Sequence, residues 1–480
     1  MTQKIIVDPV TRIEGHLKVE VEVDNGVVVD ARCTGTMFRG LELIMQGRDP
    51  RDAQQIMIRI CSVCPLAHSN AAALALDSAF GIEPPPNGRI LRNLMFGSNY
   101  LQSHILHFFH LAALDYVKGP DVPPFVPRYQ ADYRLPDAIN KAAVDRYLQA
   151  LQMRRKAHEM LAIWSGRVPG MQGIVPGGAT ETVNAQKIID FKFRLAELID
   201  FVDNVYVPTV QAVAEAYADW FDIGRGPKNL LAFGGFPLEE GPDHVAKKKF
   251  FPSGVYIGGK DAPLDPDKVT EQVKYSWYAD DIAKSPTEAV VKPEPTKPEA
   301  YSWLKAPRYA GHVMEVGPLA RQWVMGTKEV RALGDKAFSV MGRHFARAIE
   351  ASQIAHAMDE WVMQLQPGEP VATPYEIPKE ERQGIGLVEG SRGALGHWHK
   401  IEGGRTAVYN AVVPTTWNCS PRDDLGQRGA VEQALLGVTV KDANNPVELV
   451  RIVRAFDPCL ACAIHLMTPD KKEIAQFIVG

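Results

Sequence analysis

The 480-residue sequence has few cysteines, little net charge and no long uninterrupted apolar run. Only six cysteines occur, and four of them form two Cys-x-x-Cys pairs. In a large chain this pattern favours metal or redox chemistry over a disulfide framework. The net charge of −4 argues against nucleic acid or an anionic membrane as the main partner.

The sequence also shows neither an export signal nor a membrane span. Met1–Pro9 lacks a basic stretch followed by an apolar run, so we expect no export address on this chain itself. The most apolar region, Leu91–Val117, contains charged and amide side chains and three histidines, which make it too polar to cross a bilayer. With 46% hydrophobic residues, the chain is long enough to bury a sizeable core without disulfides.

Local patterns predict an α+β fold that is predominantly helical. Apolar and charged residues alternate across Leu17–Asp24, and Asn25-Gly26 then predicts the turn of a hairpin. Strands and turns are expected again in Gly384–Val413. The long helical patterns are Leu91–Tyr116, Lys141–Trp164 and Asn184–Trp220, the last interrupted at Pro208, and a short helix is expected at Pro446–Ala455. The long helices predict a central bundle.

We expect one large unit and no separately folded domains. Residues 1–50 form the N-terminal β-hairpin region, 51–225 the helical core, 226–310 a Gly- and Pro-rich irregular segment, and 311–465 a helical and β C-terminal region. Five prolines in Ser285–Pro307 favour an extended surface segment there.

The two cysteine pairs lie near opposite ends of the chain. Cys61 and Cys64 are followed by His68, and Cys459 and Cys462 are followed by His465. Four thiolates are the soft ligands that select zinc, nickel or iron over magnesium or calcium. Because 398 positions separate Cys61 from Cys459, such a site closes only when the two β-rich end regions meet.

Spacing alone favours two ordinary interpretations of these pairs. A structural zinc site usually closes within about 15–20 residues, which does not fit this separation. One iron–sulfur cluster would use both pairs and leave Cys33 and Cys419 isolated. On spacing, zinc or an iron–sulfur cluster still comes before any rarer metal.

The residues around the pairs change that order. Arg-x-Cys-x-x-Cys-x-x-x-His and Asp-Pro-Cys-x-x-Cys-x-x-His resemble the two signature motifs of [NiFe]-hydrogenase large subunits, most of all the respiratory uptake group. The resemblance continues through five further strings, which are Asp8–His16, Gly35–Glu42, Glu315–Leu319, Arg392–Trp398 and Val413–Asn418. It therefore runs from residue 8 to residue 465 in chain order.

The resemblance implies a buried nickel–iron centre. Nickel would be bound by Cys61, Cys64, Cys459 and Cys462, and Cys64 and Cys462 would also bind an iron that carries one CO and two cyanide ligands. The implied activity is reversible, heterolytic cleavage of H2 into protons and electrons. The thiolates would offset the metal charge and donate electrons to the metals.

The same resemblance assigns further residues, each with a more ordinary interpretation. Glu14 matches a proton-relay carboxylate, although a surface salt bridge is commoner for such a residue. Arg392 matches a guanidinium over the metals, and Asp457 a carboxylate beside it that could equally cap a turn. His68 matches a residue that hydrogen-bonds a bridging thiolate. Glu42 and His465 match magnesium ligands.

Some features give no site or depart from the family pattern. His104, His107 and His110 recur every third residue, but steps of three drift around a helix, so packed histidines are favoured over a metal site. Ser103 stands where the family has an aspartate, and Ser391 where it has a proline.

The resemblance also implies partners. Cys33 and Cys419 are too few for a cluster, so an iron–sulfur small subunit is expected to take the electrons, in a heterodimer or a higher oligomer. A nickel-insertion system and an endopeptidase that removes residues 466–480 are expected as well. The expected location is periplasmic or membrane-associated through the partner's export signal, with the cytoplasm as the alternative. A hydrogen sensor and a zinc or iron–sulfur scaffold are the competing functions.

Overall fold

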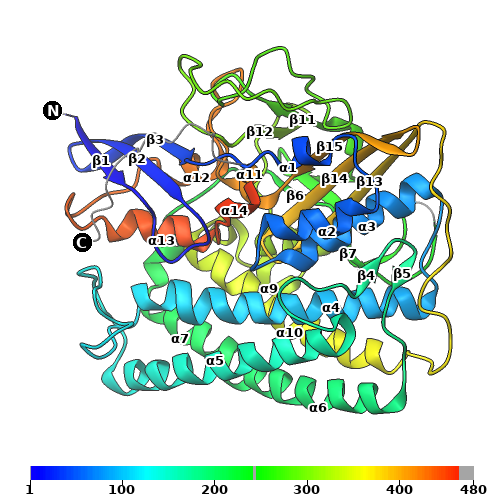
Figure 1. Ribbon diagram of the computed structural model, residues 1–480. Coiled ribbons are helices and arrows are strands. Elements are labelled where there is room, and N and C mark those ends of the chain that lie inside the picture. The colour runs from blue at the N-terminus through cyan, green and yellow to red at the C-terminus, as the bar shows by residue number, and fades with distance from the viewer. Residues whose placement is uncertain (1, 242–244, 464–480) are drawn as a thin grey trace.

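The computed structural model describes residues 2–241 and 245–463, and only the backbone of residues 462 and 463. The expectations for His465 and for residues 466–480 lie outside the described residues. The predicted mixture of helices and sheets is confirmed (Figure 1). Within the described ranges, no helix has the length and apolar character needed to cross a bilayer.

The N-terminal region is a three-stranded antiparallel sheet in the order β1-β2-β3. Its strands are β1 (Gln3–Val7), β2 (Leu17–Asp24) and β3 (Val27–Gly35). The predicted hairpin is confirmed: Asn25 and Gly26 have φ values of 49° and 80°, as a two-residue turn between antiparallel strands requires. Strand β1 was not predicted, because only two of its five side chains are buried and its alternation is weak.

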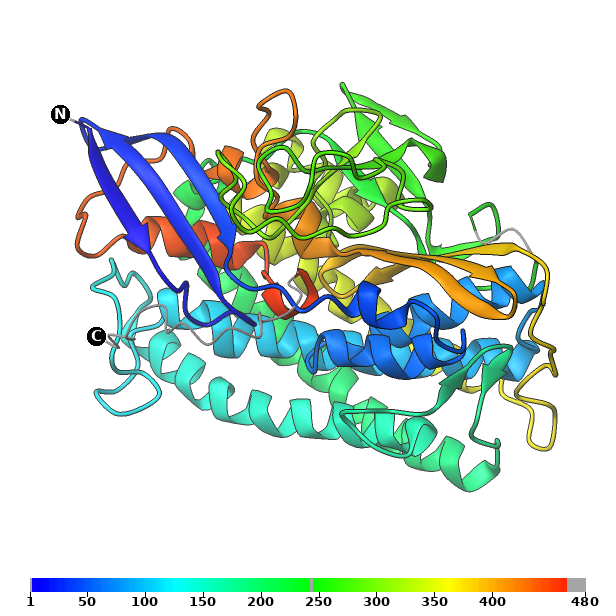
Figure 2. The same cartoon turned by 45° about the horizontal axis from the view of Figure 1, so that its top comes forward.

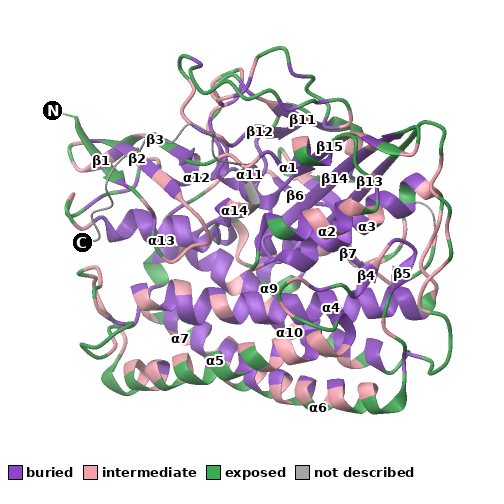
Figure 3. Cartoon of the chain, viewed as in Figure 1, coloured by how far each residue is buried: buried purple, intermediate pink, exposed green. Residues whose placement is uncertain are grey.

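Long helices occupy one side of the molecule (Figure 1). They are α4 (Pro86–Ile105), α5 (Asp137–Ser165), α6 (Ala185–Phe201) and α10 (Val340–Val362). Helix α4 contacts both α5 and α10, and almost all of its residues are buried, whereas α5 and α6 expose one face (Figure 3). Helix α4 therefore forms the centre of this side.

The interruption expected at Pro208 takes a milder form. A π-helical turn, η4 (Val202–Tyr206), joins α6 directly to α7 (Val207–Ala216). Proline lacks the N–H that would continue the regular bonding pattern, and a π turn accommodates the loss without breaking the helix. A second π-helical stretch, η2 (Leu106–Ala112), extends α4.

The other helices and strands complete the fold. The remaining helices are α1 (Leu41–Met45), α2 (Asp52–Met57), α3 (Pro65–Phe80), α8 (Pro318–Met325), α9 (Lys328–Arg331), α11 (Pro414–Asn418), α12 (Ala430–Leu435), α13 (Val447–Ala455) and α14 (Leu460–Ala463), with 3-10 turns η1 (Ile58–Ile60), η3 (Ala113–Asp115), η5 (Ala218–Phe221), η6 (Pro266–Lys268) and η7 (Gly334–Phe338). The remaining strands are β4 (Ile174–Val175), β5 (Gly178–Ala179), β6 (Leu230–Ala232), β7 (Gly235–Pro237), β8 (Lys249–Phe251), β9 (Gly254–Ile257), β10 (Lys260–Ala262), β11 (Val269–Gln272), β12 (Ala306–Tyr309), β13 (Arg382–Gly390), β14 (Gly393–Glu402) and β15 (Arg405–Val412).

The proline-rich segment is more buried than its composition predicts. Ala289 and Val291 belong to a small apolar cluster with Tyr278, and Leu304 is fully buried. The interpretation of Ser285–Pro307 as a surface segment is therefore wrong for these residues. The run Ala289–Val291 is too short, among lysines, glutamates and prolines, to predict a buried element.

Helix α3 packs directly on strand β13 of the C-terminal sheet (Figure 2). The strands predicted in Gly384–Val413 are confirmed as the antiparallel sheet β13-β14-β15. A Cβ atom built on Gly384 would lie 1.9 Å from the carbonyl oxygen of Ala75, and one on Gly386 would lie 2.0 Å from that of Ala71. Backbone thus meets backbone at this contact, which sets the position of the helix that begins next to Cys64.

We predict that Gly386→Ala destabilises the protein by about 1–3 kcal/mol, because the added methyl overlaps the backbone of α3 and neither side can yield. The measurement is the urea midpoint and melting temperature of the purified protein. Gly390→Ala on the same strand is the control, since its methyl would meet only ordinary contacts, at 3.5 Å or more. Equal stability of the two variants would contradict the prediction.

Candidate metal centre

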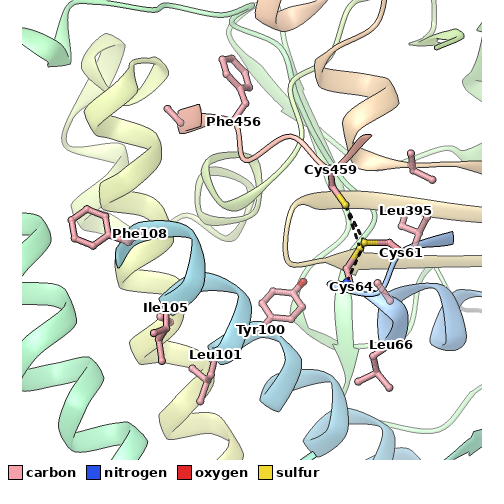
Figure 4. Close-up of a cluster of buried hydrophobic side chains, with 14 of the residues drawn as sticks. Cys61, Cys64, Leu66, Tyr100, Leu101, Ile105, Phe108, Leu395, Phe456 and Cys459 are labelled. Atoms are coloured by element: carbon pink, nitrogen blue, oxygen red, sulfur yellow. Dashed lines mark hydrogen bonds between the residues drawn. The ribbon is translucent and has the colours of Figure 1, made fainter. Parts of the chain in front are cut away.

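Three cysteines from opposite ends of the chain converge in the interior (Figure 4). The Sγ atom of Cys459 lies 3.2 Å from that of Cys61 and 3.9 Å from that of Cys64. Both distances are longer than the about 2.05 Å of a disulfide bond. Metal–thiolate bonds of about 2.3 Å allow sulfurs on one metal to be no more than ~4.6 Å apart, so both distances fit a shared ion.

The local backbone holds each thiol in place. Pro65 opens α3 immediately after Cys64, and the amides of Val63 and Cys64 donate to the Cys61 sulfur at 3.3 and 3.4 Å. The amide of Cys459 donates to Thr415 Oγ1 at 2.8 Å. Amide donors stabilise negative charge on sulfur, so the surroundings of Cys61 favour its thiolate form. The side chain of the fourth predicted ligand, Cys462, lies outside the described residues.

Glu14 lies beside the sulfurs, half-buried. Its backbone forms a parallel bridge with Cys459, and its Oε2 atom accepts from the amide of Ala461 at 2.8 Å and from Cys459 Sγ at 3.3 Å. Burial, with the charge of Cys61, raises the pKa of the Glu14 carboxyl above its usual range. Both of these hydrogen bonds go to residues 459 and 461, beside the sulfurs. They do not support the interpretation of Glu14 as part of a surface salt bridge.

Arg392 and Asp457 form a buried pair at the same place. Arg392 Nε donates to the carbonyl oxygen of Asp457 at 3.1 Å, and Nη2 lies 3.1 Å from Asp457 Oδ1. Burial opposes the charge of Arg392, but Asp457 and the three cysteines outweigh burial and hold its pKa well above the usual range. Arg392 also lines a cavity of about 10 Å³ together with Cys64 and Cys459. The cationic side chain therefore faces the sulfurs.

The two departures from the family pattern lie in contact with each other. Ser391 Oγ donates to Ser103 Oγ at 3.0 Å, and Arg392 Nη1 donates to the same Ser103 oxygen at 3.5 Å. All three side chains are buried. Two neutral hydroxyls thus stand beside Arg392 where the family pattern has an aspartate and a proline. The carboxylate that pairs with the Arg392 guanidinium in this structure is therefore that of Asp457.

His68 lines the same cavity and introduces two residues that sequence reasoning missed. Its Nδ1 atom lies 3.1 Å from His397 Nε2, and His397 Nδ1 lies 2.7 Å from the Tyr409 hydroxyl. His397 belongs to the string Arg392–Trp398 that carries the family resemblance, so the signal was present. For Tyr409 the sequence gives no comparable signal.

Arg39 is another residue to which the sequence analysis gave no role. Its guanidinium donates to the carbonyl oxygens of Ala461 at 2.6 Å and Arg59 at 3.2 Å, and it also contacts that of Ile60. It therefore joins the segments that carry the two cysteine pairs. Arg39 lies in the matching string Gly35–Glu42, which could have identified it.

The remaining predicted residues lie apart from the sulfurs. Glu42 is buried in the first turn of α1, and its proposed companion His465 lies outside the described residues. The Nε2 atoms of the three spaced histidines bond different partners: His104 with Glu350 Oε1, His107 with the Arg454 carbonyl and His110 with the Tyr147 carbonyl. Cys33 and Cys419 are buried outside the cluster, and burial raises both of their pKa values, so they are held as thiols.

Comparison with known proteins gives a consistent result. A family model described as nickel-dependent hydrogenase matches residues 39–124 and 117–465, and a HoxL-like model matches residues 4–35. The periplasmic [NiFeSe] hydrogenase large subunit of Desulfomicrobium baculatum is 48% identical, over 98% of this chain and 96% of that one. The uptake hydrogenase large subunit of Rhizobium leguminosarum bv. viciae is 34% identical, over 99% and 97%. The solved Ni-Fe-Se hydrogenase of D. vulgaris Hildenborough in its reduced state superposes with a TM-score of 0.93 at 50% identity, over 97% of this chain and 100% of that one.

We predict that Cys64→Ser lowers the bound transition metal at least tenfold, because a hydroxyl is a poor ligand for a soft metal ion. Elemental analysis of the purified protein measures nickel, iron and zinc together. Cys33→Ser is the matched control: it makes the same atom exchange at a buried cysteine outside the cluster, and it should leave the metal content unchanged. Equal metal loss in both variants would contradict the assignment.

Proposed function

Since the chain belongs to the nickel-dependent hydrogenase family, as the large, catalytic subunit of a hydrogenase, we propose that its hydrogen chemistry takes place at the cluster of Cys61, Cys64 and Cys459. The observation that carries the proposal is the convergence of these sulfurs, within 4.8 Å of one another in the interior. The uptake hydrogenases and, at higher identity, the [NiFeSe] hydrogenases are its relatives. A zinc or iron–sulfur scaffold does not fit such relatives.

We propose that all four cysteines, Cys462 included, bind nickel, and that Cys64 and Cys462 also bind an iron with one CO and two cyanide ligands. The three thiols are buried, and Cys61 Sγ accepts from two backbone amides, an environment that fits soft metal ions. When bound, the metals supply the redox-active Lewis acid at which H2 is cleaved heterolytically. The protein supplies the thiolates, a small cavity lined by buried residues, and the groups that handle charge and protons.

The first proton acceptor beyond the sulfurs is proposed to be Glu14. Cys459 Sγ lies 3.3 Å from Glu14 Oε2, so a proton can pass between these atoms without rearrangement. The raised pKa suits the carboxyl for both taking and releasing a proton. Because Glu14 is only half-buried, it can pass the proton away from the dry interior.

We propose that Arg392 balances negative charge at the cavity and that Asp457 holds its guanidinium in place. Both are buried, so the field of the guanidinium is not screened by water. The Ser103–Ser391 pair adds hydrogen bonds to this arrangement without adding charge. Arg392 and Asp457 therefore add one positive and one negative charge to those of the thiolates and Glu14.

The chain ends are proposed to serve the same centre. Glu42 and His465 would bind magnesium, and residues 466–480 would keep the end of the chain open until an endopeptidase removes them, after the nickel-insertion proteins have acted. We propose that residues 1–480 work as one unit, with the long helices as a central bundle and the two β-rich end regions meeting at the metals. The buried carboxylate of Glu42 supports the magnesium site.

A hydrogenase large subunit works with a small subunit. We propose that this partner carries iron–sulfur clusters, since each H2 releases two electrons and the described cysteines outside the centre are only Cys33 and Cys419. The D. baculatum relative is periplasmic by name, and we propose the same location here, with export through the partner. The cytoplasm is the alternative location. Turnover of H2 separates this function from a hydrogen sensor.

We predict that Glu14→Gln lowers H2 turnover about a hundredfold or more, while nickel and iron stay bound. The amide keeps the shape of the side chain but cannot accept a proton at neutral pH. Glu22→Gln serves as the control, because Glu22 is exposed on β2, and its turnover should equal that of the wild type. The assays are H2 uptake with an artificial dye and elemental analysis. Turnover within about threefold of wild type would assign the relay to another group.

We also predict that active, nickel-loaded enzyme ends at His465. Cleavage would free the terminal carboxylate and let this residue settle beside Glu42. Intact-mass spectrometry of the active fraction measures the end directly, with metal-free protein as the comparison. Active enzyme that retains all residues through Gly480 would show that residues 466–480 are an ordinary C-terminal segment.

A further inference from the structure

A file of buried hydrogen-bonding groups runs from the sulfur cavity into the C-terminal sheet. His68, on α3, is followed by His397 on β14 and then by Tyr409 on β15, with contacts of 3.1 and 2.7 Å. Each side chain is at most 2% exposed. His68 lines the cavity together with Cys64, Cys459 and Arg392. The file therefore ends at the metal centre on one side and in the sheet on the other.

The members of the file inside the sheet are neutral. Burial, together with the neighbouring His68 and His399, lowers the pKa of His397 well below its usual range. Burial, reinforced by the charge of Glu42, raises the pKa of the Tyr409 phenol well above its usual range, so the phenol keeps its proton. A neutral imidazole has one N–H donor and one acceptor nitrogen. Which atom donates in each of these hydrogen bonds is therefore decided by the groups at the two ends, Tyr409 and the sulfurs.

We propose that Tyr409 and His397 are positioning residues that fix the tautomer of His68, so that His68 presents an Nε2–H donor to the thiolates. The Tyr409 hydroxyl donates to His397 Nδ1, and His397 Nε2–H donates to His68 Nδ1. The only nitrogen of His68 left to carry a proton is then Nε2. This inference rests on the proposed function, because the donor matters only when thiolates bind a metal.

The opposite direction is unfavourable at both ends. If the hydrogen bonds ran the other way, the Tyr409 O–H would have to point to an acceptor other than His397. The Nε2 lone pair of His68 would then face negatively charged sulfur. His399 does not bond the phenol: its Nε2 atom lies 2.9 Å from Thr406 Oγ1, its Nδ1 atom has no hydrogen-bond partner among the described residues, and its ring packs edge-on against Tyr409. The arrangement in which Tyr409 donates to His397 and His397 donates to His68 is therefore favoured, with all three side chains neutral.

A fixed N–H···S hydrogen bond has a measurable consequence at the metals. It withdraws electron density from the thiolate, which raises the reduction potential of the centre. Loss of the bond makes the thiolate a stronger donor and increases back-donation from iron into its CO ligand. The infrared stretching band of that CO then moves to lower wavenumber. A purely structural role of Tyr409 would not move this band in a set direction.

The test is Tyr409→Phe in the complete enzyme with its small subunit. We expect unchanged nickel, a CO band at lower wavenumber, a more negative midpoint potential and roughly tenfold slower turnover. Tyr217→Phe is the matched control, because it removes the hydroxyl of another buried tyrosine, which within the described part of the chain bonds only backbone groups: the carbonyls of Tyr116 and Asp132 and the amide of Arg134. Its CO band should equal that of the wild type. An unshifted band in Tyr409→Phe, or the same shift in Tyr217→Phe, overturns the proposal.

A second pair of variants decides the matter if Tyr409→Phe does not retain nickel. His397→Gln keeps one acceptor and one donor in the file and should hold the wild-type band, whereas His397→Leu keeps neither and should show the shift. Equal bands in the two variants overturn the proposal. A wild-type enzyme without nickel or a CO band would instead overturn the proposed function, so the two failures are distinguishable.

Discussion

The structure depends on bringing two segments that lie 398 residues apart together in a dry interior. Such a meeting buries backbone amides and carbonyls, and each costs about 1–3 kcal/mol if it is left without a partner. Several of these groups are paired by contacts between the two segments themselves. The amide of Leu460 donates to the Glu14 carbonyl at 2.7 Å, and Arg39 bonds carbonyls on both cysteine segments. The same contacts that pair the backbone therefore place the sulfurs.

A second set of buried charges positions the turn that carries Arg392. Arg321 lies between Glu350 and Glu389, at 2.6 and 2.7 Å, and its guanidinium also donates to the carbonyls of Gly390 at 2.8 Å and Ser391 at 2.9 Å. These carbonyls belong to the turn that carries Arg392. Removing one partner of such a buried network typically costs about 3–5 kcal/mol, because a charge is left uncompensated. The orientation of Arg392 is thus tied to residues that never touch the sulfurs.

Sequence reasoning succeeded where a local pattern determines the structure. The hairpin around Asn25-Gly26 follows from turn chemistry, and the cysteine pairs follow from ligand spacing together with their flanking residues. It failed where the partner comes from a distant part of the chain. Strand β1 has too weak an alternation to be recognised, and the apolar residues of the proline-rich segment are buried only through tertiary packing. The bond between His397 and Tyr409 crosses two strands whose register no single strand encodes.

The parallel bridge between Glu14 and Cys459 also bears on synthesis of the protein. A ribosome releases Cys61 and Cys64 early, whereas the segment that completes the cluster emerges only when translation is almost finished. A chain that ends before Cys459 contains the sequences of all the long helices but lacks this sulfur of the cluster. The number of sulfurs in the cluster therefore distinguishes a chain that extends through Cys459 from one that ends before it.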